Sequence, residues 1–460
     1  MAEPRAPSEA EQLPRRFLFN INFVFVSALT SNTIGFLVVI LLARSLGPDG
    51  RGETVLYQAA VSLGFAFLSL GIGSAAFYFV RRGEVGGRQA VEAGLNVSLL
   101  AAAIAAVAVL ITAVFFDAQL ADRHIPYWLA IFTVPAVIQL RLAELLLRAH
   151  GRFGAMNALE VGLPVSMCVC LGGVELAAGL TVPRAVWAWS LSYLPPLLLG
   201  YALLGRSFWP RRLAPLSLML KMLTFGGQGQ LTNLIQLFNY RLDSFLILVF
   251  VNTTGVGLYS VASSQTEGLL IIANSVGIVL LTNITGEDPY RSATLTGVVC
   301  RNTLLITTVS AAVAALIAAF WIPVVFGSDF GDAVVPYLWL LPGMAFLSAS
   351  KILAAYVFSR GRPIINAWIA LATLLATIPT DIVLIQLFGV AGAAAGTSLG
   401  YLLGLALTAL AYRHLSGAAV AEALLPRRSD AAIYLDALRS LRAKLAQRRT
   451  AKAASGSGVS

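Results

Sequence analysis

The sequence has very little charge and almost no cysteine or histidine. Only 12% of its 460 residues are charged, and it contains three cysteines and three histidines. Soluble globular domains carry about 25% charged residues, so this composition excludes an ordinary soluble domain. Cys168, Cys170 and Cys300 lie inside apolar runs, which argues against a disulfide framework. The histidines stand singly, without metal-ligand spacing. We therefore expect no metal site and no cofactor.

The chain also lacks the signatures of enzymes. It contains no Gly-x-Ser-x-Gly, no phosphate-binding glycine-rich loop and no paired-aspartate metal motif. The longest segment between apolar runs is residues 206–217, too short to hold a catalytic domain. A membrane glycan polymerase or ligase would need such a domain, so we expect no catalytic residues and no enzyme activity.

Long apolar runs dominate what is present. Hydrophobic residues make up 58% of the chain, and its mean hydropathy is +0.80. About twelve runs are long enough to cross a hydrocarbon core of about 30 Å. Three of the predicted spans are 53–80, 184–205 and 257–284. The sequence therefore predicts an all-α, multi-span membrane protein with about twelve transmembrane helices.

The positive charge follows the pattern of a membrane topology. The net charge of +10 is concentrated in alternate loops, at Arg81 and Arg82, Arg148 and Arg152, Arg211 and Arg212, and Arg360 and Arg362. The other loops are poor in basic residues and carry Asp117, Asp122, Asp329 and Asp332. Basic residues favour the cytoplasmic side, so both termini are predicted to be cytoplasmic. This placement also argues against nucleic acid as a partner. From the polar residues 1–14 and the length of the first apolar run we expect no cleavable signal peptide.

One pattern occurs twice, about half a chain apart. Gly52 ends a turn after one apolar run as Gly257 does after another, and Gly151-Arg152 matches Gly361-Arg362 in the same way. Repeated halves are typical of transporters, which build a site at the interface between them. We predict a cytoplasmic N-terminus (1–16), a six-helix bundle (17–205), a cytoplasmic linker (206–217), a second six-helix bundle (218–414) and a basic cytoplasmic tail (415–460).

The tail and the last span each leave two interpretations open. Residues 427–452 form either a basic amphipathic helix on anionic membrane lipids or a solvated tail that fixes the topology, and 453–460 are expected to be disordered. Glycines 392, 396, 400 and 404 form one bare helix face. We favour packing within the chain over a dimer interface, and therefore a monomer.

The first helix of each predicted half is unusually polar. The opening span contains Asn32, and its counterpart contains Asn233, Gln236, Asn239, Arg241 and Asp243. Side chains that hydrogen-bond cannot be left facing lipid, so these helices should face protein or water. The spacing places Gln236, Asn239 and Asp243 on one stripe, for which we predict a water-filled cavity between the halves.

Further charges occur inside other spans, where an ionised side chain costs roughly 2.5–3.5 kcal/mol on the mildest scale. They include Arg141, Glu267 and Asp381. Arg141, Glu144 and Arg148 share one helix face, so they form either a self-neutralising ladder or a functional group.

Several of these segments resemble bacterial polysaccharide flippases. They are Ala43-Arg-Ser-Leu-Gly-Pro at the end of the first helix, Phe238-Asn-Tyr-Arg-Leu-Asp in the seventh with Gly257-Leu-Tyr259 after it, and the turns Arg148-Ala-His-Gly-Arg-Phe-Gly154 and Arg360-Gly-Arg-Pro363. The resemblance covers about residues 17–414. It is to the oligosaccharide-lipid flippase branch of the multidrug/oligosaccharidyl-lipid/polysaccharide exporter (MOP) superfamily.

The resemblance implies two bundles in a V around a central cavity, with alternating access. It implies that undecaprenyl-pyrophosphate-linked oligosaccharide units cross the bacterial inner membrane for O-antigen, capsule or exopolysaccharide synthesis. Lipid II flippases commonly have fourteen helices, which disfavours a peptidoglycan role. Multidrug exporters of the superfamily have about twelve, so a cation-coupled exporter is the alternative. A net positive cavity would favour the flippase, and a net negative one the exporter.

The flippase interpretation assigns roles to the polar residues. Arginine matches phosphate oxygens through its planar fork, and amides can hydrogen-bond sugar hydroxyls. The predicted substrate-binding residues are Arg241, Arg141, Arg44, Asn32, Asn233, Gln236 and Asn239. The predicted sites for a coupling cation or proton are Asp243, Asp381 and Glu267.

Overall fold

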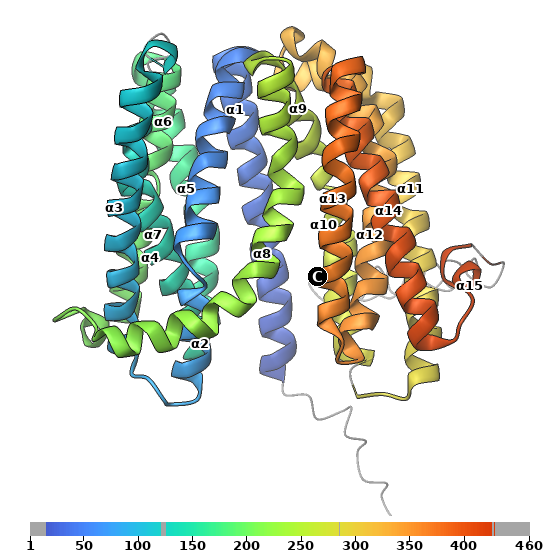
Figure 1. The fold of residues 1–460 in the computed structure, drawn as a ribbon, viewed down its shortest axis with the longest axis horizontal. Helices are drawn as coiled ribbons and strands as arrows, with labels where there is room; N and C mark the ends of the chain where they lie inside the picture. The colour runs from blue at the N-terminus through green and yellow to red at the C-terminus, as the bar shows by residue number, and fades with distance from the viewer. Residues whose placement is uncertain (1–14, 121–125, 285, 426, 428–460) are drawn as a thin grey trace, which may run out of the picture. The chain divides into compact units, whose positions relative to one another are not determined.

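The computed structural model describes residues 15–120, 126–284, 286–425 and 427. Residues 1–14 of the predicted N-terminus and nearly all of the predicted amphipathic part of the tail lie outside this range. The helices are α1 (Arg15–Leu68), α2 (Ile72–Arg81), α3 (Gly87–Leu120), α4 (Ala130–Ala149), α5 (Phe153–Ala178), α6 (Val182–Leu191), α7 (Leu194–Leu204), α8 (Leu216–Phe250), α9 (Thr253–Glu267), α10 (Leu270–Ile284), α11 (Pro289–Phe326), α12 (Val334–Ser359), α13 (Pro363–Phe388), α14 (Val390–Ser416) and α15 (Val420–Leu424). Figure 1 shows these α-helices. Three 3-10 helices, η3 (Tyr127–Leu129), η4 (Arg206–Phe208) and η5 (Ser328–Ala333), complete the described elements.

The helices are long and apolar enough for a multi-span membrane protein, as predicted. Within the described residues, eight helices satisfy the length and hydropathy needed to cross a membrane, or nine if α9 and α10 form one span. The polar α8 and the short helices α2, α6 and α7 fall outside that count. Each overlaps a segment that the sequence predicts to be a span, and the all-α, multi-span class is confirmed.

Three spans predicted to be continuous are broken. The span 53–80 is divided between the end of α1 and α2, 184–205 between α6 and α7, and 257–284 between α9 and α10. In the first break Leu70 and Gly71 have positive φ angles of 47° and 71°, which end a helix. Each break lies at polar or helix-breaking residues, namely Ser69 and Gly71, Pro195 and Pro196, and Gln265 to Gly268, which a search for long apolar runs passes over.

The chain forms two compact units. Unit 1 contains residues 1–266, 315–340 and 370–399, and unit 2 contains residues 267–314, 341–369 and 400–460. Unit 1 thus includes α1 to α8, almost all of α9 and segments of α11 to α14. The division into bundles 17–205 and 218–414 stays a prediction from the repeat.

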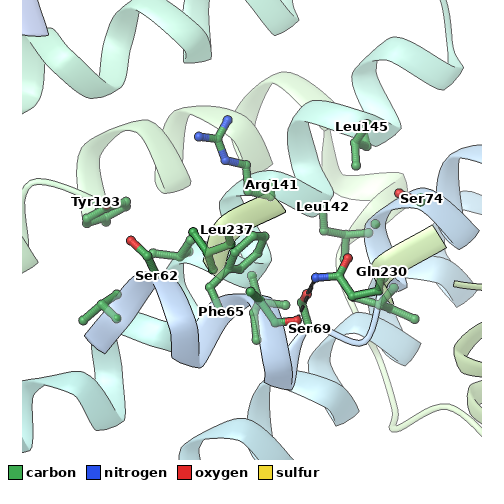
Figure 2. A pocket seen from close by; sticks show the side chains of 17 residues that line it. Ser62, Phe65, Ser69, Ser74, Arg141, Leu142, Leu145, Tyr193, Gln230 and Leu237 are labelled. Carbon is green, nitrogen blue, oxygen red and sulfur yellow. Dashed lines mark hydrogen bonds between the residues drawn. The ribbon is translucent and has the colours of Figure 1, made fainter. Parts of the chain in front are cut away.

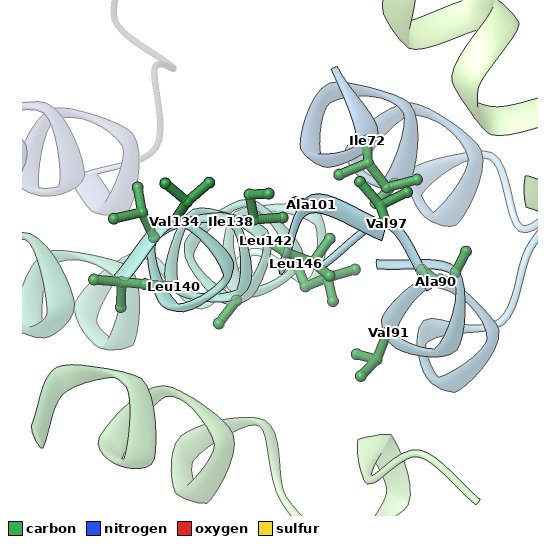
Figure 3. Packing of buried hydrophobic residues seen from close by; sticks show 14 of the residues in the cluster. Ile72, Ala90, Val91, Val97, Ala101, Val134, Ile138, Leu140, Leu142 and Leu146 are labelled. Carbon is green, nitrogen blue, oxygen red and sulfur yellow. The ribbon is translucent and has the colours of Figure 1, made fainter. Parts of the chain in front are cut away.

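The main core of unit 1 is built around α4. Val134, Ile138, Leu142 and Leu146 recur every four residues, so they lie on one face of this helix, and all are buried. Figure 3 shows this row beside Val97 and Ala101 of α3 and Ile72 of α2. Between membrane helices, close packing supplies much of the attraction because lipid tails are as apolar as leucine. A separate core in unit 2 centres on Ile352, Leu353, Tyr356 and Tyr412.

Two pairs of glycines bring helix backbones into direct contact within unit 1. A methyl group at Gly52 would lie 2.0 Å from the carbonyl oxygen of Thr253, and one at Gly257 would lie 1.8 Å from that of Pro48. We call this the α1–α9 contact. In this contact Gly52 meets Gly257, the residue at the equivalent position of the sequence repeat. The second pair is Gly71 and Gly226, where a methyl group on either would lie 2.2 or 2.5 Å from the other's carbonyl oxygen.

The linker is fastened to one face of α3. Arg88, Glu92 and Asn96 follow each other at four-residue spacing, so they share a face. Arg88 donates to the carbonyl of Ser207 at 3.0 Å, and Asn96 donates to that of Ala214 at 2.8 Å. Glu92 accepts from the backbone N–H of Arg211 at 3.2 Å. The linker is therefore an ordered part of unit 1.

Candidate functional site

Two aspartates and two hydroxyl groups meet inside unit 1. Asp243 lies on α8, Tyr259 on α9, Asp381 on α13 and Thr397 on α14, and each side chain is at most 4% exposed. The sequence therefore predicted two members of this group, Asp243 and Asp381, from segments 138 residues apart. It missed the other two, although Tyr259 belongs to the Gly-x-Tyr motif and Thr397 follows Gly396 of the glycine row.

Asp243 is held by hydroxyl groups. Tyr259 donates its hydroxyl to Oδ2 of Asp243, and the hydroxyl of Thr397 lies 2.8 Å from the same oxygen. Thr397 is also 2.9 Å from the carbonyl oxygen of Ala393, so its single proton is available to one of the two acceptors at a time. The sequence placed Asp243 on a water-facing stripe. That expectation is wrong, because the side chain is 3% exposed.

Asp381 lies in the same interior. Its side chain is fully buried, and no hydroxyl, amide or cationic group of the described residues donates to either carboxylate oxygen. Its neighbour is Asp243, and the two carboxyl groups can share a hydrogen bond when one of them carries a proton. A methyl group at Gly396 would lie 1.9 Å from Oδ1 of Asp381, so the bare glycine makes room for the carboxylate beside Thr397. Asp381 is near enough to Asp243 for the two charges to interact.

Two buried carboxylates without a cation cannot both stay ionised at reasonable cost. Within the described residues neither Asp243 nor Asp381 forms an ion pair with lysine or arginine. The site therefore needs a proton or a bound cation. The oxygen atoms that could bind it belong to carboxylate, hydroxyl and carbonyl groups, which suit a proton or a hard cation. We call this group the aspartate site.

A cavity of about 430 Å³ lies elsewhere in unit 1, between the end of α1, α4 and α8. Its lining is mostly apolar, and Figure 2 shows Arg141 and Gln230 on different sides of it with Leu142 and Leu237 between them. Gln230 donates to the carbonyl of Ala66 at 2.7 Å, near the break between α1 and α2. The amide thus satisfies a carbonyl that the broken helix leaves without its usual partner.

Arg141 is already paired inside this cavity. It donates to Glu144 at 2.8 Å, and its side chain remains 51% exposed. This ion pair is one of the two that a ladder of Arg141, Glu144 and Arg148 would contain. The other, between Glu144 and Arg148, is not found within the described residues. Arg141 is therefore a neutralised cation with one side still open to the cavity.

The other predicted residues are dispersed. Arg44 donates to the carbonyls of Val324 and Val325 at 2.5 and 2.8 Å, near the end of α11. Asn239 donates to the carbonyls of Ile235 and Ala370. Asn32 and Gln236 are exposed on α1 and α8. Glu267 belongs to unit 2, and the side chain of Asn233 lies outside the described residues.

Solved structures share this arrangement of helices. Lipid II flippase MurJ in an inward closed conformation covers 84% of this chain and 87% of its own, with 13% identity and a TM-score of 0.70. An inward-facing multidrug resistance MATE family transporter of the MOP superfamily covers 85% and 97%, with 14% identity and a TM-score of 0.65. The Vibrio cholerae MATE transporter VcmN in its bent form covers 86% and 97%, with 14% identity and a TM-score of 0.53. The chain therefore has the fold that lipid II flippase MurJ shares with the MATE transporters.

The sequence itself gives the family. Residues 17–281 match the model of the polysaccharide biosynthesis protein family. Because this match covers more than half of the chain, the protein belongs to that family, and the resemblance seen in the sequence is confirmed. A comparison with curated proteins gave no match.

Proposed function

We propose that the protein is a flippase that moves undecaprenyl-pyrophosphate-linked oligosaccharide units to the outer leaflet of the bacterial inner membrane. The family match supports a role in polysaccharide synthesis. The observation that carries the transport mechanism is the aspartate site, where buried carboxylates need a proton or cation. Loading and releasing that ion changes the charge buried between α8, α13 and α14. Alternating access can be driven by that change.

The aspartate site alone would also suit a cation-coupled multidrug exporter, which needs an unpaired buried acid. A transport assay distinguishes the flippase from the exporter. Purified protein in vesicles should make a lipid-linked oligosaccharide accessible to a glycosidase on the far side, and an ion gradient should accelerate this. Uptake of lipophilic cations without movement of the lipid-linked sugar would establish the exporter instead.

The first prediction concerns topology. With both termini cytoplasmic, cysteines placed at 328–332 should react with an impermeant reagent added outside intact cells. Cysteines at 83–87 and 208–212 should react only after the membrane is opened, because the loops rich in arginine stay inside. Reaction of the 208–212 positions in intact cells would reverse the orientation.

The second prediction concerns Asp243→Asn. The amide keeps the shape of the side chain but cannot change its charge, so we expect substrate binding to remain and turnover to fall. The transport rate should fall on the order of tenfold. A buried charge costs roughly 2.5–3.5 kcal/mol, and Asp381 can still bind the proton or cation, so only part of this energy is lost to the cycle. The dependence of transport on pH or on the coupling ion should weaken.

Measuring abundance, binding and transport together distinguishes coupling from simple support of the fold. Tyr259→Phe is the matched control, because it removes a hydrogen bond to Asp243 and leaves both carboxylates. We expect it to keep the ion dependence. A low abundance of Asp243→Asn in the membrane would indicate a supporting role, and normal transport with unchanged ion dependence would exclude coupling.

A further inference from the structure

The linker and the first turns of α8 form a surface of unit 1 that is both basic and apolar. Residues 206–220 include three arginines and no acidic residue. All three are exposed, and none forms an ion pair within the described residues; they are Arg206, Arg211 and Arg212. Four large apolar side chains are each at least half exposed, and they are Trp209, Leu213, Leu216 and Leu220. We call these seven residues the linker surface.

The backbone beneath the linker surface is fixed to unit 1. Hydrogen bonds with α3 hold the carbonyls of Ser207 and Ala214. The ring of Phe208 packs inward, with its centroid 5.1 Å from that of His150, whereas the next residue, Trp209, is 55% exposed. The exposed side chains are therefore held in place, and little conformational entropy is lost when a partner binds them.

The acids that bind this part of the chain do not neutralise its arginines. Glu92 accepts from the backbone N–H of Arg211 at 3.2 Å, so the guanidinium group of that residue is not used. Glu84 pairs with Lys221 at 3.3 Å and with Arg82 at 3.1 Å. The three arginines of the linker surface thus keep their charge, and their attraction for anions is directed away from the protein.

The start of α8 has the length and the two faces of a helix at a membrane surface. The apolar segment Leu216–Gly227 is only about 18 Å long at about 1.5 Å per residue, whereas a span needs about 30 Å. Figure 1 shows it running across the end of α3 rather than along it. Met222 is fully buried in the core of unit 1, while Leu216 and Leu220, one turn apart, are exposed. One face therefore packs on the protein, and an apolar face is directed outward.

Anionic phospholipid is the partner that fits this combination. Leucine and tryptophan side chains enter the boundary between headgroups and acyl chains, where tryptophan is enriched in membrane proteins. Arginines beside them meet the negative charge of the headgroups. A soluble acidic partner would match the arginines alone and leave the leucines without an apolar environment.

We propose that the linker surface lies among the headgroups of the adjacent leaflet and binds anionic phospholipids. The topology predicts that this leaflet is the cytoplasmic one. The sequence predicted contact with anionic lipids only for the tail, which carries its charge in residues 427–452. The linker surface is a second and separate contact, built on ordered backbone. It does not depend on which molecule the protein transports.

Thermal unfolding of the purified full-length protein tests the charge selectivity. In micelles of a neutral detergent, added phosphatidylglycerol should raise the unfolding temperature more than added phosphatidylcholine does, because a ligand that binds the folded protein stabilises it. The triple variant Arg206→Gln, Arg211→Gln and Arg212→Gln should lose most of this difference. It should unfold normally in neutral micelles, because the bonds to α3 use backbone atoms of the linker.

Two further triple variants keep the test decisive. Lysine at the same three positions keeps the charge, so most of the phosphatidylglycerol effect should remain even if the glutamine variant folds poorly. The control replaces three exposed arginines elsewhere by glutamine, at Arg291, Arg362 and Arg413, and should also keep the effect. Loss of the effect in the lysine variant or the control would overturn the proposal, as would equal effects of the two lipids. An equal, arginine-dependent effect of soluble polyglutamate would assign the surface to an acidic protein and overturn it too.

Fluorescence quenching tests the position of the linker surface. In a chain whose three cysteines have been replaced, a fluorophore attached at Leu216→Cys should be quenched in vesicles by lipids with a quencher near the headgroup. Quenchers in the middle of the acyl chains should act less. A fluorophore at Arg362→Cys, in an exposed turn, is the control and should be quenched by iodide in the water. Quenching of the Leu216→Cys label by iodide alone would place the surface in water and refute the proposal.

Discussion

Gly257→Ala is expected to abolish transport while the protein remains in the membrane. The added methyl group would lie 1.8 Å from the carbonyl oxygen of Pro48 and 2.7 Å from its carbonyl carbon. Both atoms belong to the backbone, so neither can rotate away. Overpacking of this kind costs about 1–3 kcal/mol or more. We expect the α1–α9 contact to open and the transport rate to fall on the order of 100-fold or more, since each 1.4 kcal/mol is about tenfold in an equilibrium.

Cross-linking reports the contact directly. In a chain whose three cysteines have been replaced, Asp49→Cys with Thr254→Cys should form a disulfide readily, because these side chains meet at 3.5 Å. The yield should drop sharply when Gly257→Ala is added. Gly35→Ala on α1 is the matched control, since nothing lies within 4 Å of the added methyl group. Undiminished cross-linking and transport in Gly257→Ala would show that the contact plays no part in the cycle.

Arg241→Ala is expected to abolish glycan export without lowering the amount of protein in the membrane. If Arg241 binds pyrophosphate, the variant loses two charge-assisted hydrogen bonds of about 1.5–3 kcal/mol each. The expected loss of transport is on the order of 100-fold or more. Arg241→Lys should recover only part of it, because an ammonium group lacks the planar fork.

Two comparisons make this result specific. Arg44→Ala should have a smaller effect, because that guanidinium already donates to two backbone carbonyls. Arg184→Ala should leave export unchanged and controls for the loss of one positive charge. Export at the normal rate by Arg241→Ala would remove Arg241 from the mechanism.

The sequence predicted the class of fold, and it matched Gly52 with Gly257 as equivalent positions of a repeat without predicting a contact between them. Apolar runs long enough to cross the bilayer can hardly be anything other than spans. Gly52 and Gly257 were paired by the repeat alone. The structure adds that they touch, which no repeat can show because symmetry relates positions without fixing their distance.

The aspartate site shows where prediction from sequence ends. Asp243 and Asp381 were identified because charge inside a span is costly, but their meeting depends on how α8, α13 and α14 pack. Tyr259 and Thr397 are uncharged and ordinary in a membrane helix, so nothing in their identity marked them. The helix breaks were missed for a different reason: isolated glycine, serine or proline residues, such as Ser69 and Gly71 beside Leu70, are tolerated inside long apolar runs and do not by themselves fix where a helix ends.

The ordered linker has a practical consequence for protein engineering. A chain built from two similar halves invites cutting between them, to express the halves separately or to insert a reporter. Backbone that is hydrogen-bonded tolerates such changes poorly. In this protein the attachment of Ser207, Arg211 and Ala214 to α3 makes the midpoint the wrong place to cut. The exposed turn at Gly361 is the better site for a fused domain, because its backbone N–H is bonded only within the turn, to the carbonyl of Phe358.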